Sequence, residues 1–278
     1  MTNLAILYRG PLGSCNYGCR YCPFAKRRDT AAQLRYDRQC LERFTVWIEQ
    51  QTGHTWSLLF TPWGEALTRR WYRQAMEQLS HLAHVRKVAV QTNLSCPVDW
   101  LDRCRPDRLG IWASFHPTEV ALDRFVEKVS YVRQRGISLS VGMVGVPEHR
   151  EVIKQLRAAI PSDVYVWINA LGRRTRKYAD EEVAFFKAID PLFEVNLSRH
   201  ASGGRACRTG ETVFTVDGTG AMRRCHFVET VIGNIYRDDW LQALQPRPCQ
   251  RKFCKCHIGY VHLEHLQNLR WHGRGCNA

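Results

Sequence analysis

The first two hundred residues alternate between short apolar stretches and longer segments with helical spacing. Apolar stretches predict six strands, at residues 4–8, 56–60, 88–92, 109–114, 138–144 and 164–168. Helical spacing predicts helices at 37–50, 68–82, 118–135 and 151–159, with Thr68 as the N-cap of the second and Gly136 as the stop of the third. This alternation is typical of an α/β fold with a parallel sheet. Because a closed eight-fold barrel usually needs ~250 residues, we expect an open, partial (β/α)6 TIM-like barrel.

Length and composition agree with a folded protein. The chain has 278 residues, of which 45% are hydrophobic, enough for one large domain and a small appendix. It has no apolar run of the ~18 residues that suggest a membrane span, and its start lacks the features of a signal peptide. Its twelve cysteines therefore suggest reduced, metal-binding thiols and a cytoplasmic location.

The chain is strongly basic, with a formal net charge of +14. Such a surface favours acidic partners, although a generally basic protein would show the same balance. Local clusters of basic residues stand at positions 26–28 and 173–177. No RNA-binding module motif is present, so a nucleic-acid partner is not expected.

Three cysteines stand close together directly after the first predicted strand. Cys15, Cys19 and Cys22 have the spacing C-x3-C-x2-C. A [4Fe–4S] cluster normally takes four cysteines, so three would leave one iron open, as a catalytic metal site requires. The alternatives are a zinc knuckle or a disulfide loop, but the spacing matches no common zinc pattern.

Polar residues and glycines follow the later strands. Gly64 and Glu65 come after the second strand, Asn93 after the third, and Ser114 and His116 at the end of the fourth. In barrels of this kind the chemistry lies at the carboxyl ends of the strands. Each of these residues alone could serve a turn or a cap. Their order along successive strand ends favours a shared site.

With these motifs in place, the chain resembles the radical S-adenosylmethionine (radical SAM) superfamily over essentially its whole length. The cysteine triplet, with Tyr21 before its third member, is similar to the family's cluster signature. Gly64-Glu65 resembles the Gly-Gly-Glu segment that contacts the SAM amino group, and Gln91-Thr92-Asn93 resembles the Thr-Asn-Gly strand end. Ser114 stands where a SAM-contacting serine often sits. Trp63, Ala66 and Leu94 depart from the family's residues at their positions.

The resemblance implies a cofactor set and a reaction. It implies a three-cysteine [4Fe–4S] cluster that binds SAM, and a 5′-deoxyadenosyl radical that abstracts a substrate hydrogen. The SAM-binding residues would be Tyr21, Gly64, Glu65, Asn93 and Ser114. An electron donor such as flavodoxin or ferredoxin is implied as a partner.

A second group of cysteines fills the segment after about residue 200. Asp217-Gly218-Thr219-Gly220 predicts a hairpin turn, and the pattern from Cys207 to Cys225 contains G-x4-C. This tail resembles the SPASM and twitch domains, which carry auxiliary clusters. The resemblance implies a core at residues 1–200, an auxiliary domain at 201–278 and a second [4Fe–4S] cluster, with ligands drawn from Cys207, Cys225, Cys249, Cys254 and Cys256.

Other readings of the cysteines stay open. We expect Cys207, Cys225 and Cys254 to ligate together with either Cys249 or Cys256. His226 and His257 follow two of these cysteines, and a sulfur-rich zinc site would use such ligands. The four further cysteines read as ordinary, and Cys40 is expected to pack as a small hydrophobe; they are Cys40, Cys96, Cys104 and Cys276.

The expected function is a radical SAM oxidation or rearrangement. The substrate would be a small molecule, acidic or phosphorylated, or a peptide, and the auxiliary cluster would accept an electron or anchor the substrate. The alternatives are maturation of a ribosomal peptide and a non-catalytic iron–sulfur or zinc protein that binds nucleic acid. No catalytic acid or base is assigned. His116 is the best polar candidate for the pocket, and a cap before Thr118 is its other interpretation.

Overall fold

The computed structural model describes residues 2–24, 28–171 and 177–266. Most of the two basic clusters predicted from the sequence, at residues 26–27 and 173–176, lies outside the described residues, as does Cys276.

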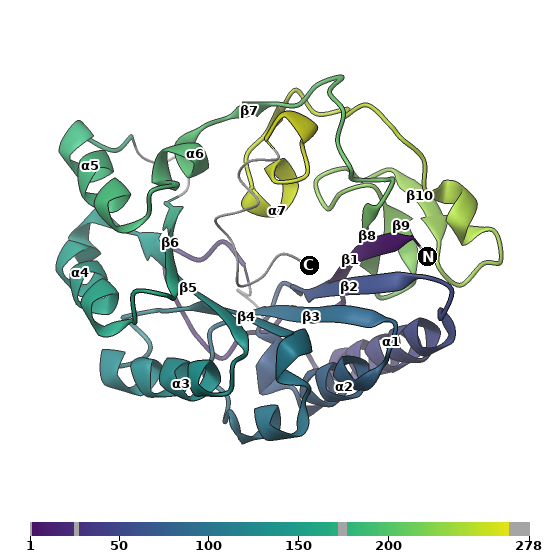
Figure 1. Ribbon diagram of the computed structural model, residues 1–278, viewed down its shortest axis with the longest axis horizontal. Coiled ribbons are helices and arrows are strands. Elements are labelled where there is room, and N and C mark those ends of the chain that lie inside the picture. The colour runs from purple at the N-terminus through teal and green to yellow at the C-terminus, as the bar shows by residue number, and fades with distance from the viewer. Residues whose placement is uncertain (1, 25–27, 172–176, 267–278) are drawn as a thin grey trace.

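Six parallel strands form the body of the protein. They are β1 (Asn3–Arg9), β2 (Thr55–Phe60), β3 (Val85–Thr92), β4 (Leu109–Ser114), β5 (Ser138–Gly145) and β6 (Tyr165–Ala170), paired in chain order. The pairing is parallel throughout, with Ile6 opposite Leu58 and Val90 opposite Ile111. The strands curve into an open arc (Figure 1). This confirms the predicted α/β class and the partial barrel.

Helices cover the outer side of the arc (Figure 1). They are α1 (Ala31–Gln50), α2 (Arg70–His81), α3 (Leu122–Gln134) and α4 (Arg150–Ala159), followed by α5 (Asp180–Ile189) and α6 (Phe193–Leu197). Each of the first four turns apolar residues spaced three or four apart towards the sheet, as an amphipathic helix does. The buried side chains include Phe44, Ile48, Met76, Leu79, Val129, Val132, Ile153 and Leu156, all in one continuous core.

Three predicted helix starts are wrong for local reasons. Helix α1 begins six residues earlier than predicted, because Thr30 and Gln33 form a capping box. Thr68 does not cap α2: it ends the short helix η1 (Ala66–Thr68), and its hydroxyl donates to the Glu65 carbonyl. Helix α3 begins at Leu122, later than predicted. Its predicted stop is confirmed, since Gly136 has a φ of +68°.

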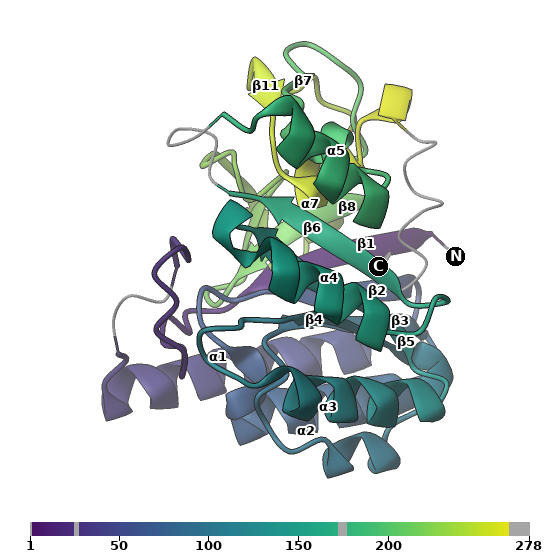
Figure 2. The same ribbon diagram turned by 90° about the vertical axis from the view of Figure 1, so that its left-hand side faces the viewer.

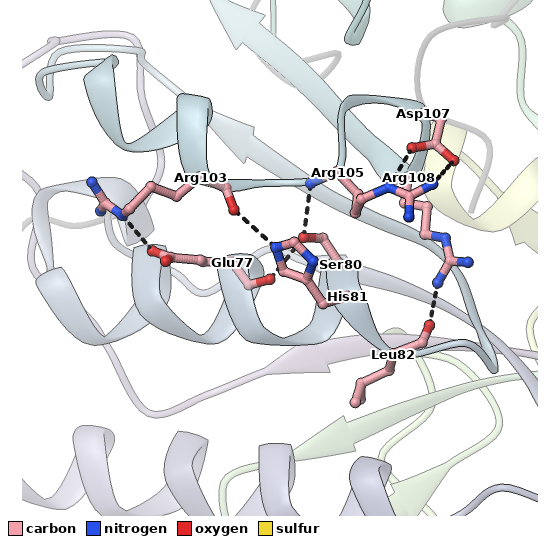
Figure 3. Close-up of polar contacts among 8 residues, drawn as sticks. All are labelled: Glu77, Ser80, His81, Leu82, Arg103, Arg105, Asp107 and Arg108. Carbon is pink, nitrogen blue, oxygen red and sulfur yellow. Dashed lines mark hydrogen bonds and ion pairs between the residues drawn. The ribbon is translucent and has the colours of Figure 1, made fainter.

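The link from β3 to β4 has no α-helix. It consists of the short helices η2 (Asp99–Arg103) and η3 (Pro106–Arg108), which polar contacts hold against α2 (Figure 3). The Arg103 side chain pairs with Glu77 at 3.0 Å, and the Arg105 backbone N–H donates to the Ser80 hydroxyl at 3.1 Å. The connection also packs Trp100, Leu101 and Cys104 into the core.

The tail adds strands to the same sheet. They are β8 (Val213–Asp217), β9 (Ala221–Arg223) and β10 (Val231–Asn234), so the order becomes β10-β9-β8-β1-β2-β3-β4-β5-β6. Strand β8 is parallel to β1, and the predicted β8–β9 hairpin is confirmed as antiparallel. The helix η5 (Trp240–Ala243) follows β10.

The rest of the tail lies over the open side of the arc. Strands β7 (His200–Ala201) and β11 (Phe253–Cys254) pair with each other, and the short helix α7 (His257–Tyr260) follows. Helix α7 lies between β6 and β8, and the views of Figures 1 and 2 show the tail above the strands. The division at residue 200 stays a prediction. No helix in the described part of the chain has the length and apolar character to cross a bilayer.

Candidate functional site

The loop that carries the cysteine triplet is anchored by two carboxylates. Asp29 accepts hydrogen bonds from the backbone N–H groups of Gly13 and Ser14, both at 2.8 Å, and from the Ser14 hydroxyl at 2.9 Å. Asp37, on α1, accepts from the Leu12 N–H at 3.0 Å. Burial raises the pKa of Asp37, while hydrogen bonds from Trp71, Tyr72 and the Leu12 N–H oppose the shift. The backbone before Cys15 is therefore fixed by charged acceptors.

The three cysteines each have a defined neighbour. The Cys15 sulfur accepts from the Tyr17 N–H at 3.4 Å, the Cys19 sulfur lies 3.3 Å from His116 Nδ1, and the Cys22 sulfur lies 3.6 Å from the Phe24 carbonyl. Burial raises the pKa of Cys15, and it raises the pKa of Cys19 to about 11. The Cys19 thiol is therefore protonated at neutral pH, and metal binding would release its proton.

Glu65 joins the ends of β2 and β3. Its carboxylate accepts from the Thr92 hydroxyl and the Asn93 N–H, both at 2.6 Å, and from the Leu67 N–H at 3.1 Å. The side chain is buried, and this burial raises its pKa. Gly64 packs against the Ser14 backbone so tightly that a Cβ would lie 2.1 Å from the Ser14 carbonyl oxygen. The predicted Gly-Glu segment therefore contacts the cysteine loop directly.

Asn93 connects the end of β3 to the first cysteine. Its side-chain amide donates to Asn16 Oδ1 at 3.0 Å and lies 3.7 Å from the Cys15 sulfur. The next residue, Leu94, has a φ of +52° and is buried. That conformation favours glycine, which is the third residue of the Thr-Asn-Gly strand end that residues 92–94 resemble. The chain thus keeps the backbone turn although it lacks the glycine.

A cleft of about 1060 Å³ opens beside the cysteine loop. Two of the predicted SAM-binding residues, Tyr21 and Ser114, line it together with His116. The Tyr21 hydroxyl lies 3.0 Å from His116 Nδ1, and the two rings stack at 5.9 Å. Burial lowers the pKa of His116 to about 4, so its imidazole is neutral at pH 7. His116 lies in the pocket, where the sequence placed it, and the nearest helix starts only at Leu122.

Four of the five tail cysteines line one small cavity: Cys207, Cys225, Cys249 and Cys254. The fifth, Cys256, lines the large cleft instead. Burial raises the pKa of Cys225 to about 11 and that of Cys254 to about 12. Through the described residues, no three His, Cys, Asp or Glu side chains converge as ligands of one metal ion.

The two histidines that directly follow tail cysteines do not line the four-cysteine cavity. His226 and His257 both line the large cleft. The His257 ring packs at 4.6 Å from Trp167 and at 5.8 Å from Trp112. Burial lowers the pKa of His257 to about 4, and burial and then Arg9 lower that of His226 to about 3. Neither histidine stands as a ligand beside the four thiols.

Sequence reasoning missed several residues of the site. Asp29 and Asp37 anchor the cysteine loop from a distance along the chain. Arg9, Trp112 and Trp167 line the cleft. For Arg9 a signal existed, because it ends an apolar strand just before the cysteine loop. For the two tryptophans none existed, since a large apolar residue in a strand reads first as core. Cys40, Cys96 and Cys104 are buried and line neither the large cleft nor the four-cysteine cavity.

Solved structures share this architecture. One is anSMEcpe with bound AdoMet and the Cp18Cys peptide, at 14% identity and a TM-score of 0.58, covering 98% of this chain and 87% of that one. Another is SuiB from Streptococcus suis, at 14% identity and a TM-score of 0.54, covering 86% of this chain and 66% of that one. At these identities the likeness establishes the fold. No protein-family model and no curated protein sequence matches the chain.

Proposed function

We propose that this chain, which has the fold of the radical SAM superfamily, is a radical SAM enzyme. Cys15, Cys19 and Cys22 would hold a [4Fe–4S] cluster with one open iron that binds SAM. When bound, the two cofactors supply a 5′-deoxyadenosyl radical that abstracts a hydrogen from the substrate. One observation carries the proposal: the cysteine loop contacts the ends of β2, β3 and β4, through Gly64, Asn93 and His116.

The donor set suits an iron–sulfur cluster. Three thiols stand on a loop whose backbone is fixed by Asp29 and Asp37. The Cys15 sulfur faces two N–H donors, from Tyr17 and Asn93, and such donors stabilise a ligating thiolate. Cluster ligands bind different irons, so three thiols need not converge on one point.

Glu65 suits the amino group of SAM. Its hydrogen-bond donors among the described residues are neutral: Thr92, Asn93 and Leu67. They occupy three of the roughly four lone-pair positions of a carboxylate. A buried carboxylate gains most from a cationic partner, and the SAM ammonium is one. Glu65 would therefore brace the strand ends and also orient the cofactor.

The four-cysteine cavity suits the auxiliary [4Fe–4S] cluster. Cys207, Cys225, Cys249 and Cys254 bring four thiols to one place, and a cluster without an open iron takes four. Among the described residues no three such ligands converge on one point, which supports a cluster over a single zinc ion. The auxiliary cluster would accept the electron left on the substrate, which makes the net reaction an oxidation, or would anchor the substrate.

Two substrate classes fit the cleft. At about 1060 Å³, it is as large as the upper range of small-molecule pockets. A small oxidised or rearranged molecule fits this volume. A peptide is the second candidate, because anSMEcpe shares the fold and was solved with a peptide bound.

Metal analysis under anaerobic conditions tests the cofactor assignment. The protein is purified without oxygen, and iron, sulfide and zinc are counted per chain. Two four-iron clusters predict about eight irons and eight sulfides. Four irons with one zinc would overturn the auxiliary cluster alone. A protein that binds zinc and no iron would overturn the radical SAM assignment.

A further inference from the structure

Arg9 projects into the cleft from the last position of β1. The centre of its guanidinium lies 4.4 Å from the centroid of the Trp63 ring. Phe24 packs against the same tryptophan, with ring centroids 5.0 Å apart. Trp63 thus forms a platform that fixes the guanidinium in place. It is also the residue that stands where the family has a glycine, so the platform belongs to this chain.

The guanidinium has hydrogen-bond donors to spare. Its Nε is buried and has no hydrogen-bond partner among the described residues. No described carboxylate forms an ion pair with it, and the acidic groups that act on it electrostatically are the thiols of Cys256 and Cys225. Burial lowers the pKa of Arg9, yet a guanidinium stays protonated at pH 7. An unpaired buried donor of this kind costs stability until an acceptor arrives.

The cleft as a whole favours an anion. Three of the lining side chains carry a positive charge: Arg9, Arg20 and Lys255. Among the described lining residues, Glu119 supplies the carboxylate. The Glu119 carboxylate acts electrostatically on Cys19 and His116, beside the cysteine loop. The tail thiols of Cys256 and Cys225 act in the same way on Arg9. Among the described residues, no carboxylate therefore pairs with Arg9.

We propose that Arg9, held over Trp63, binds an anionic oxygen group of the substrate, a carboxylate or a phosphate. A guanidinium can donate two parallel hydrogen bonds to either group. The anchor would hold the substrate at the end of β1, beside Trp63 and Phe24. Only the identification of the bound anion as part of the substrate rests on the proposed function. The anion-binding site itself does not rest on it.

Calorimetric titration with two simple anions tests the anchor. Inorganic phosphate and glutarate are titrated at constant ionic strength into the iron-loaded wild type and three variants, R9Q, R9K and R103Q. Arg103 is the matched control, because it is an exposed arginine that pairs with Glu77 on α2 (Figure 3). We expect at least one anion to bind the wild type and R103Q equally, and R9Q about 10-fold more weakly.

The same titration distinguishes a phosphate group from a carboxylate group as the anion that Arg9 binds. Phosphate binding alone indicates a phosphorylated substrate, and glutarate binding alone indicates a carboxylate. R9K keeps the charge but loses the paired donors, so its affinity should fall between those of wild type and R9Q, and it serves alone if R9Q does not fold. The inference is overturned if neither anion binds the wild type, or if the Arg9 variants bind as the wild type does.

SAM cleavage by the wild type is measured in parallel. Cleavage without Arg9-dependent anion binding would overturn the anchor and leave the proposed function intact. Arg9-dependent binding without cleavage would support the anion site and count against the enzyme assignment.

Discussion

The carboxylate of Glu65 and the backbone N–H of Asn93 form a 2.6 Å hydrogen bond that joins the ends of two neighbouring strands. The side chain of Asn93 then reaches the sulfur of Cys15 at 3.7 Å. Three segments that are far apart in the sequence thus meet at one hydrogen-bonded corner, which Cys15, Glu65 and Asn93 form. The properties of that corner can be tested residue by residue.

Removing the Thr92 hydroxyl should destabilise the corner. Thr92 donates to Glu65 at 2.6 Å and accepts from the Leu94 N–H at 2.9 Å, so T92V leaves the buried Leu94 N–H unpaired and removes one of the three hydrogen bonds to Glu65. We expect a loss of about 1–3 kcal/mol in the free energy of unfolding. T45V is the matched control, since the buried Thr45 hydroxyl makes one bond within its own helix, at 3.0 Å. Equal losses in urea unfolding would contradict the network.

Leu94 should reverse the usual order of alanine and glycine. Both L94A and L94G lose a buried side chain, but only glycine adopts a φ of +52° without strain. L94G should therefore be more stable than L94A by about 1 kcal/mol. At the exposed helical residue Ala184 of α5 the order should be normal, with A184G costing about 1 kcal/mol. A more stable L94A would show that the turn is not strained.

Asp217 should contribute stability that acid removes. Burial alone would raise its pKa, but hydrogen bonds from Arg223, at 2.6 Å, and from Thr219 bring the pKa below its ordinary value. A lowered folded-state pKa gives stability above the unfolded pKa of about 3.9, and that stability is lost as the pH falls through the folded pKa. Wild type should therefore exceed D217N in stability at pH 6, and the gap should shrink below about pH 4. A gap that does not depend on pH would contradict the assignment.

Cys249 and Cys256 should behave differently as ligands. Cys249 lines the cavity with three other thiols, whereas Cys256 lines the large cleft. C249A should therefore lose about four irons per chain, and C256A should keep them. The check is an iron and sulfide count on both variants, with C40A as the control for a buried cysteine outside the site. Loss of the cluster in C256A with retention in C249A would reverse the ligand assignment.

Local sequence pattern was enough to predict the strands and most of the helices, and to place the cysteine loop and the polar residues at the strand ends. Runs such as Leu4 to Tyr8 read as strands because both faces of a parallel sheet are buried, and the strand ends then had to share one edge. The start of α1 was missed because Thr30 and Gln33 act through their caps and not through apolar spacing. His116 meets Cys19 and Arg9 meets Trp63 across long stretches of chain. Such contacts depend on the tertiary fold, so no local sequence pattern predicts them.

The most direct test of the radical SAM assignment is whether the reduced protein cleaves SAM. The anaerobic enzyme is reduced with dithionite and given SAM, and 5′-deoxyadenosine and methionine are measured over time beside a C19A variant. We predict that the wild type forms both products and that C19A forms neither, while it keeps the iron of the tail cluster. Wild-type protein that carries its full iron and yields no 5′-deoxyadenosine, or C19A that yields as much as wild type, would contradict the claim.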